Sequence, residues 1–87
     1  MKLIFCPHCQ DVFKLQINEM RYCKCGKSYG QYTDNINAEI NKEAIPIGFS
    51  NSTFIYALLN RPETGLGKEF CAFVIPNHCE SIKIIED

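Results

Sequence analysis

Four cysteines form two close pairs near the start of the chain. Two residues separate Cys6 from Cys9, one residue separates Cys23 from Cys25, and thirteen residues lie between the pairs. Two tight turns that each carry two thiolates can complete a tetrahedron around one Zn²⁺ ion. Because the protein would fill all four positions, such a site stabilises structure and does not activate water. The spacing predicts one structural zinc ion held by Cys6, Cys9, Cys23 and Cys25.

Four other side chains could bind a metal or act as nucleophiles, namely His8, Cys71, His78 and Cys79. A histidine between two ligands, like His8, usually points outward, and a thiol in an apolar segment, like Cys71, packs as a small hydrophobic group. His78 and Cys79 are sequence neighbours, whereas catalytic Cys–His pairs are normally assembled from distant segments. Since no other catalytic motif is present, we expect a non-enzymatic protein with a single metal site.

Basic and aromatic residues are interspersed through residues 1–33. Cations that contact phosphate, next to aromatic rings that stack on bases, are typical of single-strand binding. The alternative is a solvated hairpin face whose rings cover the metal site, and the formal net charge of −1 favours it. The candidate residues for contacting nucleic acid or a protein partner are Lys14, Arg21, Lys24, Lys27 and Tyr29.

A second possible binding site is the start of a predicted helix at about residues 51–60. The free N–H groups of a helix start attract anions, including phosphates, although ordinary helix capping explains the hydroxyl and amide residues equally well. The candidate anion-binding residues are Ser50, Asn51, Ser52 and Arg61.

The length of 87 residues predicts a single domain. A core this small is marginal, so a metal that links two turns would add needed stability. No apolar run is long enough for a signal peptide or a transmembrane helix. The close cysteine pairs then favour metal binding in a reducing cytoplasm over disulfides.

Alternation of apolar and polar residues predicts short strands at 3–5 and 12–17, with 20–22 returning as a hairpin that places both cysteine pairs at one end. Further strands are expected at 28–33 and 36–41. Pro46 suggests that residues 45–47 are extended at a sheet edge or in a loop.

The C-terminal half combines one helix with two more strands. Apolar residues at 54, 55, 58 and 59 have helical spacing, and we expect this stripe to pack on a sheet. Pro62 ends the helix. Residues 69–75 are expected to form a central strand and residues 81–85 the last one. The expected fold class is α+β, with residues 1–33 joined to an antiparallel sheet and one helix in residues 34–87.

Residues 1–33 resemble the zinc-ribbon families, including proteins with rubredoxin-like knuckles. The resemblance rests on Cys6-Pro7-His8-Cys9 and on Cys23-Lys24-Cys25-Gly26, a shortened second knuckle. Gln10 stands where glycine is usual, and this departure and the shortening make zinc a better match than iron. Residues 34–87, with Phe73-Val74-Ile75-Pro76, resemble small uncharacterised bacterial or phage zinc-ribbon proteins.

The leading functional expectation is a non-enzymatic interaction module, in which zinc holds the ribbon and an exposed face binds a protein partner. The alternatives are nucleic-acid binding through the ribbon and binding of a small anion at the helix start. A membrane partner is not expected.

Overall fold

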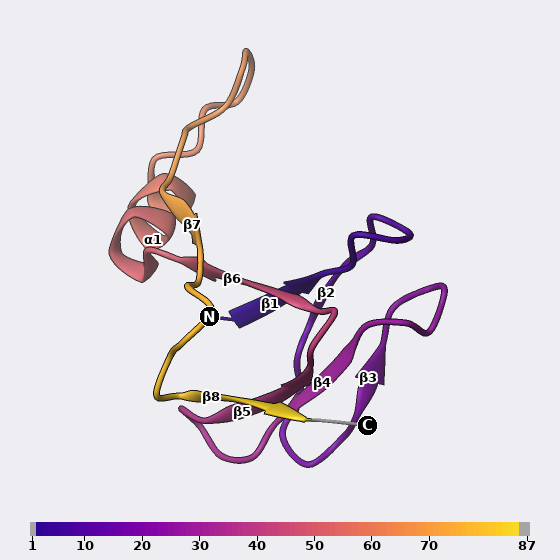
Figure 1. Ribbon diagram of the computed structural model, residues 1–87. Coiled ribbons are helices and arrows are strands. Elements are labelled where there is room, and N and C mark those ends of the chain that lie inside the picture. The colour runs from indigo at the N-terminus through magenta and orange to yellow at the C-terminus, as the bar shows by residue number, and fades with distance from the viewer. Residues whose placement is uncertain (1, 86–87) are drawn as a thin grey trace.

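In a computed structural model, which describes residues 2–85, the chain folds into two four-stranded sheets and one helix (Figure 1). This confirms the α+β fold class. The elements are β1 (Lys2–Phe5), β2 (Val12–Lys14), β3 (Arg21–Tyr22), β4 (Tyr29–Tyr32), β5 (Ala38–Asn41), β6 (Ile45–Phe49), α1 (Asn51–Leu59), β7 (Ala72–Val74) and β8 (Ile82–Ile85).

The first sheet has the order β2-β1-β6-β7, and all of its neighbours are antiparallel. The prediction that residues 45–47 lie at an edge or in a loop is wrong, because β6 is an inner strand. Proline lacks the N–H that other residues use to pair with a neighbouring strand. Pro46 is tolerated because its nitrogen faces the end of β7, beyond the last paired residue. There the Pro46 carbonyl accepts a hydrogen bond from the Ile75 N–H at 2.9 Å. The expected central strand at 69–75 is also corrected, since β7 is a short, exposed edge strand.

The second sheet has the order β3-β4-β5-β8. Its first two pairings are antiparallel, whereas β8 runs parallel to β5, with Ile40 beside Ile84. The last strand therefore exists where it was predicted, but its direction departs from the expected antiparallel sheet.

The predicted hairpin between residues 12–17 and 20–22 is wrong. β2 pairs with β1 and β3 pairs with β4, so the chain forms two separate hairpins. Strand β2 ends at Lys14 because the next residues turn towards β4. The Gln16 carbonyl accepts from the Tyr32 N–H, and the Tyr32 carbonyl accepts from the Asn18 N–H, both at 2.9 Å.

One apolar cluster joins the two sheets. Its buried members come from β1, β2, β5 and the connecting turns: Ile4, Cys6, Phe13, Leu15, Cys23, Ala38, Ile40 and Ala44. Each sheet takes two strands from residues 1–33 and two from the remainder, so both parts of the chain share this core. Two cysteines of the predicted metal site belong to it.

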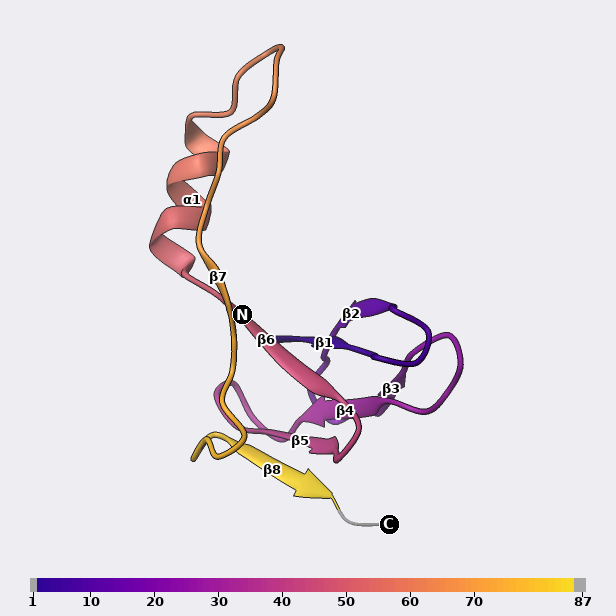
Figure 2. The ribbon, with the colours of Figure 1, turned by 45° about the horizontal axis from the view of Figure 1, so that its top comes forward.

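Helix α1 and the segment that returns to β7 project away from the sheets (Figures 1 and 2). We call residues 51–71 the arm. The prediction that the apolar stripe of the helix packs on a sheet is wrong for three of its four residues, since Ile55, Leu58 and Leu59 are exposed. The fourth, Phe54, does pack on a sheet residue, Phe49 of β6. The arm contacts β6 through three packed rings, those of Phe49, Phe54 and Phe70, whose centroids lie 4.9–5.5 Å apart.

The projecting arm makes the molecule elongated. The radius of gyration is 14.3 Å, against about 12 Å for a compact domain of this length. In residues 2–85 no helix is both long and apolar enough to cross a membrane.

Candidate metal centre

The two cysteine pairs lie in the turns of the two hairpins. Strand β1 ends at Phe5, and the turn that carries Cys6 and Cys9 leads back into β2. In the same way β3 ends at Tyr22, and the turn with Cys23 and Cys25 leads into β4. The shared core brings the two turns together.

The four sulfur atoms lie within 4.8 Å of one another. The Cys6 and Cys25 Sγ atoms are 3.7 Å apart, and those of Cys23 and Cys25 are 3.4 Å apart. Four sulfurs at about 2.3 Å from a tetrahedral zinc ion would be separated by about 3.8 Å. A disulfide would require about 2.05 Å, and all six cysteines are free thiols. Cys6, Cys9, Cys23 and Cys25 are thus positioned to bind one metal ion.

Each turn uses a residue with a left-handed backbone. Gln10 has φ = 62° and Gly26 has φ = 79°. These conformations let the Gln10 N–H donate to the Cys6 carbonyl at 2.8 Å and the Gly26 N–H donate to the Cys23 carbonyl at 3.1 Å. Gln10 therefore adopts a backbone conformation that glycine reaches more readily than residues with a side chain.

Gln10→Gly should stabilise the protein. Glycine reaches positive φ without the steric penalty of a side chain, which outweighs its larger entropy loss on folding, so we expect a gain of about 0.5–1 kcal/mol. The measurement is urea unfolding of the metal-loaded protein. Gly26→Ala is the matched variant and should lose about 1 kcal/mol, since a Cβ there meets nothing within 4 Å and only the strained φ remains. A stability loss in Gln10→Gly would contradict the argument.

Asp11 connects the two turns. Its carbonyl accepts from the Cys6 N–H at 2.9 Å, and its carboxylate accepts from the Lys24 N–H at 3.1 Å. A carboxylate in this place orients both cysteine turns, as outer-shell groups do around metal sites. Sequence spacing gave no sign of this role.

Ser28 is a second supporting residue that the sequence did not reveal. Its N–H donates to the Cys23 sulfur at 3.4 Å. Its hydroxyl is the buried side-chain polar atom that lacks a hydrogen-bond partner among the described residues, although it lies near enough to Cys6 to lower that thiol's pKa. A metal-bound thiolate is a strong acceptor and would give this hydroxyl a partner.

The pKa values of the thiols differ sharply across the cluster. Burial raises the pKa of Cys6, but the nearby Ser28 hydroxyl and hydrogen bonds from the Cys9 and His8 backbone outweigh it and lower this pKa to about 6. At Cys25 a backbone hydrogen bond from Lys27 lowers the pKa, but desolvation and the neighbouring cysteines raise it to about 12. Four thiolates this close repel one another, and a bound cation would remove that repulsion.

His8 contacts an acidic side chain. Its Nε2 atom lies 3.0 Å from the Glu43 carboxylate, so it links the first turn to the turn after β5. Cys71 is exposed on the arm, and the half-buried Cys79 contacts the Ser81 hydroxyl at 3.3 Å. His8, Cys71 and Cys79 all lie outside the four-cysteine cluster.

The predicted basic and aromatic surface is divided by the fold. Tyr22 and Tyr29 form a cross-strand pair, with ring centroids 5.1 Å apart, and Lys24 and Lys27 lie in the turn between them. Arg21 precedes Tyr22 in the strand and points to the opposite face of the sheet. Lys14 belongs to the other sheet.

The predicted anion site is divided as well. Arg61 lies beyond the C-terminal end of α1, whose nine residues span about 14 Å. At the helix start the Ser50 side chain forms no capping hydrogen bond. The Thr53 hydroxyl donates to the Ser50 carbonyl and accepts from the Cys71 N–H. The structure therefore places Ser50, Asn51 and Ser52 together but leaves Arg61 apart.

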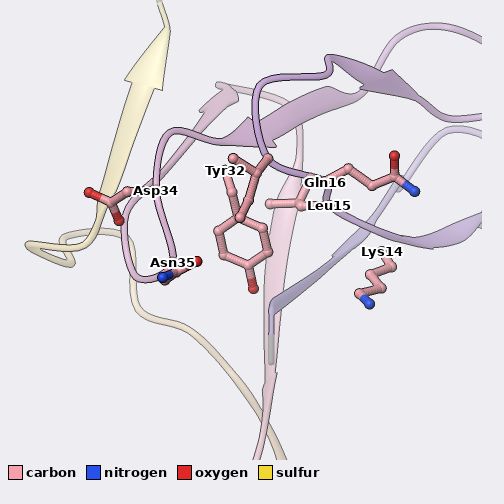
Figure 3. A pocket seen from close by; sticks show the side chains of 7 residues that line it. Lys14, Leu15, Gln16, Tyr32, Asp34 and Asn35 are labelled. Carbon is pink, nitrogen blue, oxygen red and sulfur yellow. The ribbon is translucent and has the colours of Figure 1, made fainter.

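A cleft of about 470 Å³ lies away from the cysteines, between the segment after β2 and the turn after β4. Figure 3 shows the Tyr32 ring standing between Lys14 on one side and Asp34 and Asn35 on the other. The Asp34 carboxylate accepts hydrogen bonds from the N–H groups of Ile36 and Asn37, and these bonds lower its pKa. Asp34 therefore closes its own turn, and Tyr32 stands between it and Lys14 in the cleft (Figure 3).

Comparisons with protein-family models, with curated protein sequences and with solved structures found no match for this chain.

Proposed function

We propose that this protein is a non-enzymatic interaction module, in which one structural zinc ion holds the two hairpins and the arm binds a protein partner. The observation that carries this proposal is the concentration of exposed apolar side chains on the arm.

Zinc is the ion that the site favours. Four thiolate donors at near-tetrahedral sulfur separations suit Zn²⁺, and a ligand set filled by protein leaves no position for a reactive water. The six free thiols support a reducing compartment such as the cytoplasm.

Several large apolar side chains of the arm are exposed. Leu59 is 80% exposed and Leu66 is fully exposed, while Ile55 and Leu58 each remain more than half exposed. Ile55, Leu58 and Leu59 have the i, i+3, i+4 spacing of one helix face. Isolated exposed leucines are ordinary, but a contiguous apolar patch on a projecting element is typical of an interaction site.

The test compares proteins captured from an extract by tagged variants. We expect the wild type to capture a defined partner and Leu59→Asp/Leu66→Asp to lose it, because charges on the exposed apolar surface of the arm oppose apolar docking. Ile36→Asp is the control, since Ile36 is an exposed apolar residue in the turn between β4 and β5, outside the arm. Equal capture by all three proteins would contradict the proposal.

Nucleic-acid binding is the second candidate, supported by the Tyr22–Tyr29 pair. A hollow beside the second turn is lined by Tyr29, Lys27 and Lys42, which combines a stacking surface with cations. Titration with single-stranded oligonucleotides should show affinity that falls steeply with salt. Salt-independent or absent binding would dismiss this candidate. Anion binding at the helix start has less support, because Arg61 lies at the far end of α1.

A further inference from the structure

Strand β7 differs from the other sheet edges in one respect. The edge strands of the first sheet are β2 and β7, and those of the second sheet are β3 and β8. Three of these edge strands carry a cation, respectively Lys14, Arg21 and Lys83, whereas β7 carries no charged residue. Charged side chains on edge strands prevent pairing with other chains. The edge at β7 lacks that protection.

The backbone of β7 is oriented for pairing. Cys71 and Ile75 use their backbone groups towards β6, since the Cys71 carbonyl accepts from Ser50 and the Ile75 N–H donates to Pro46. In an antiparallel ladder the alternate residues point the other way. The N–H and C=O groups of Ala72 and Val74 therefore face outward, and no strand within residues 2–85 lies on that side.

The surface around this edge carries no net charge, so it can face a second copy of itself without repulsion. Residues 70–75, Phe-Cys-Ala-Phe-Val-Ile, are uncharged, and within the arm Arg61 and Lys68 balance Glu63 and Glu69. Two copies that meet through a two-fold axis place the same surface against itself, so any net charge would repel. A neutral strand on a neutral arm avoids this cost.

From these observations we infer that two copies of this chain pair antiparallel through β7 to form a homodimer, in which the two arms point in opposite directions (Figure 2). This inference goes beyond the proposed function, since a second copy and a different protein are separate partners.

The test is light scattering of the metal-loaded protein after size exclusion, over a range of concentrations. The wild type should show twice the mass of one chain at high concentration. Val74→Pro removes an N–H that faces away from β6, so the sheet is kept but each dimer loses two hydrogen bonds, which should raise the dimer Kd roughly 10- to 100-fold. Val74→Thr keeps the N–H and the β-branched shape and should dimerise like the wild type.

A second pair of variants covers the possibility that proline disturbs folding. Val74→Lys should abolish the dimer by supplying the missing edge charge, while Val12→Lys, at the opposite edge of the same sheet, should not. Unchanged circular dichroism and metal content would show that the variants are folded. A wild type that stays monomeric, or a folded Val74→Pro that dimerises normally, would overturn the inference. Partner capture that persists in a monomeric wild type would leave the proposed function standing.

Discussion

Cys9→Ser should release the metal and unfold the protein. Zinc binding to structural sites contributes about 10–16 kcal/mol, whereas a domain is stable by only about 5–15 kcal/mol in total. Cys9 is only partly buried, so its replacement removes a ligand while leaving a smaller packing defect than replacement of the buried Cys6. Far-ultraviolet circular dichroism and elemental analysis of the variant provide the measurement.

Cys71→Ser is the matched control, because Cys71 is an exposed free thiol away from the cluster. It should keep its metal and its melting temperature. A Cys9→Ser protein that melts like the wild type would refute the structural role of the metal, and loss of metal in Cys71→Ser would place a ligand outside the cluster.

Ile40→Ala should lower the free energy of unfolding strongly, although Ile40 lies outside the metal site. Ile40 is fully buried in β5, and truncation of a buried isoleucine to alanine costs about 2–5 kcal/mol. The close packing around it, where a Cβ on Gly30 would come within 2.8 Å of the Ile40 side chain, limits collapse of the cavity. Urea unfolding of the metal-loaded protein measures the loss.

The control for this substitution is Ile84→Ala. Ile84 stands beside Ile40 in the register of β5 and β8 but is 40% exposed, so its truncation should cost about 1 kcal/mol or less. Equal losses for the two variants would show that the shared core is not where the structure places it.

The cysteine cluster and the helix were the most predictable parts of the molecule. Metal-ligand spacing is a local property, and α1 lies at Asn51–Leu59, close to the predicted 51–60. Strand pairing was less predictable because it depends on distant residues. Alternation in residues 12–17 indicated a strand but not whether β1 or β3 would be its neighbour.

Two errors have specific physical causes. The rule that proline marks an edge strand fails at Pro46, because β7 ends where the missing N–H points. The helical spacing of Ile55, Leu58 and Leu59 correctly indicated one apolar face, but periodicity cannot tell whether the same chain or another molecule covers that face. The supporting roles of Asp11 and Ser28 depend on the meeting of two hairpins, which spacing does not encode.

We propose that four cysteines hold one zinc ion and that this ion maintains the fold. The most direct test is elemental analysis of the untagged protein, combined with a count of reactive thiols before and after chelation. We expect one zinc per chain and four protected thiols that become reactive only when a chelator removes the metal, with Cys71 and Cys79 outside the protected set. A folded protein without metal, or one whose six thiols all react before chelation, would rule out a zinc ion that maintains the fold.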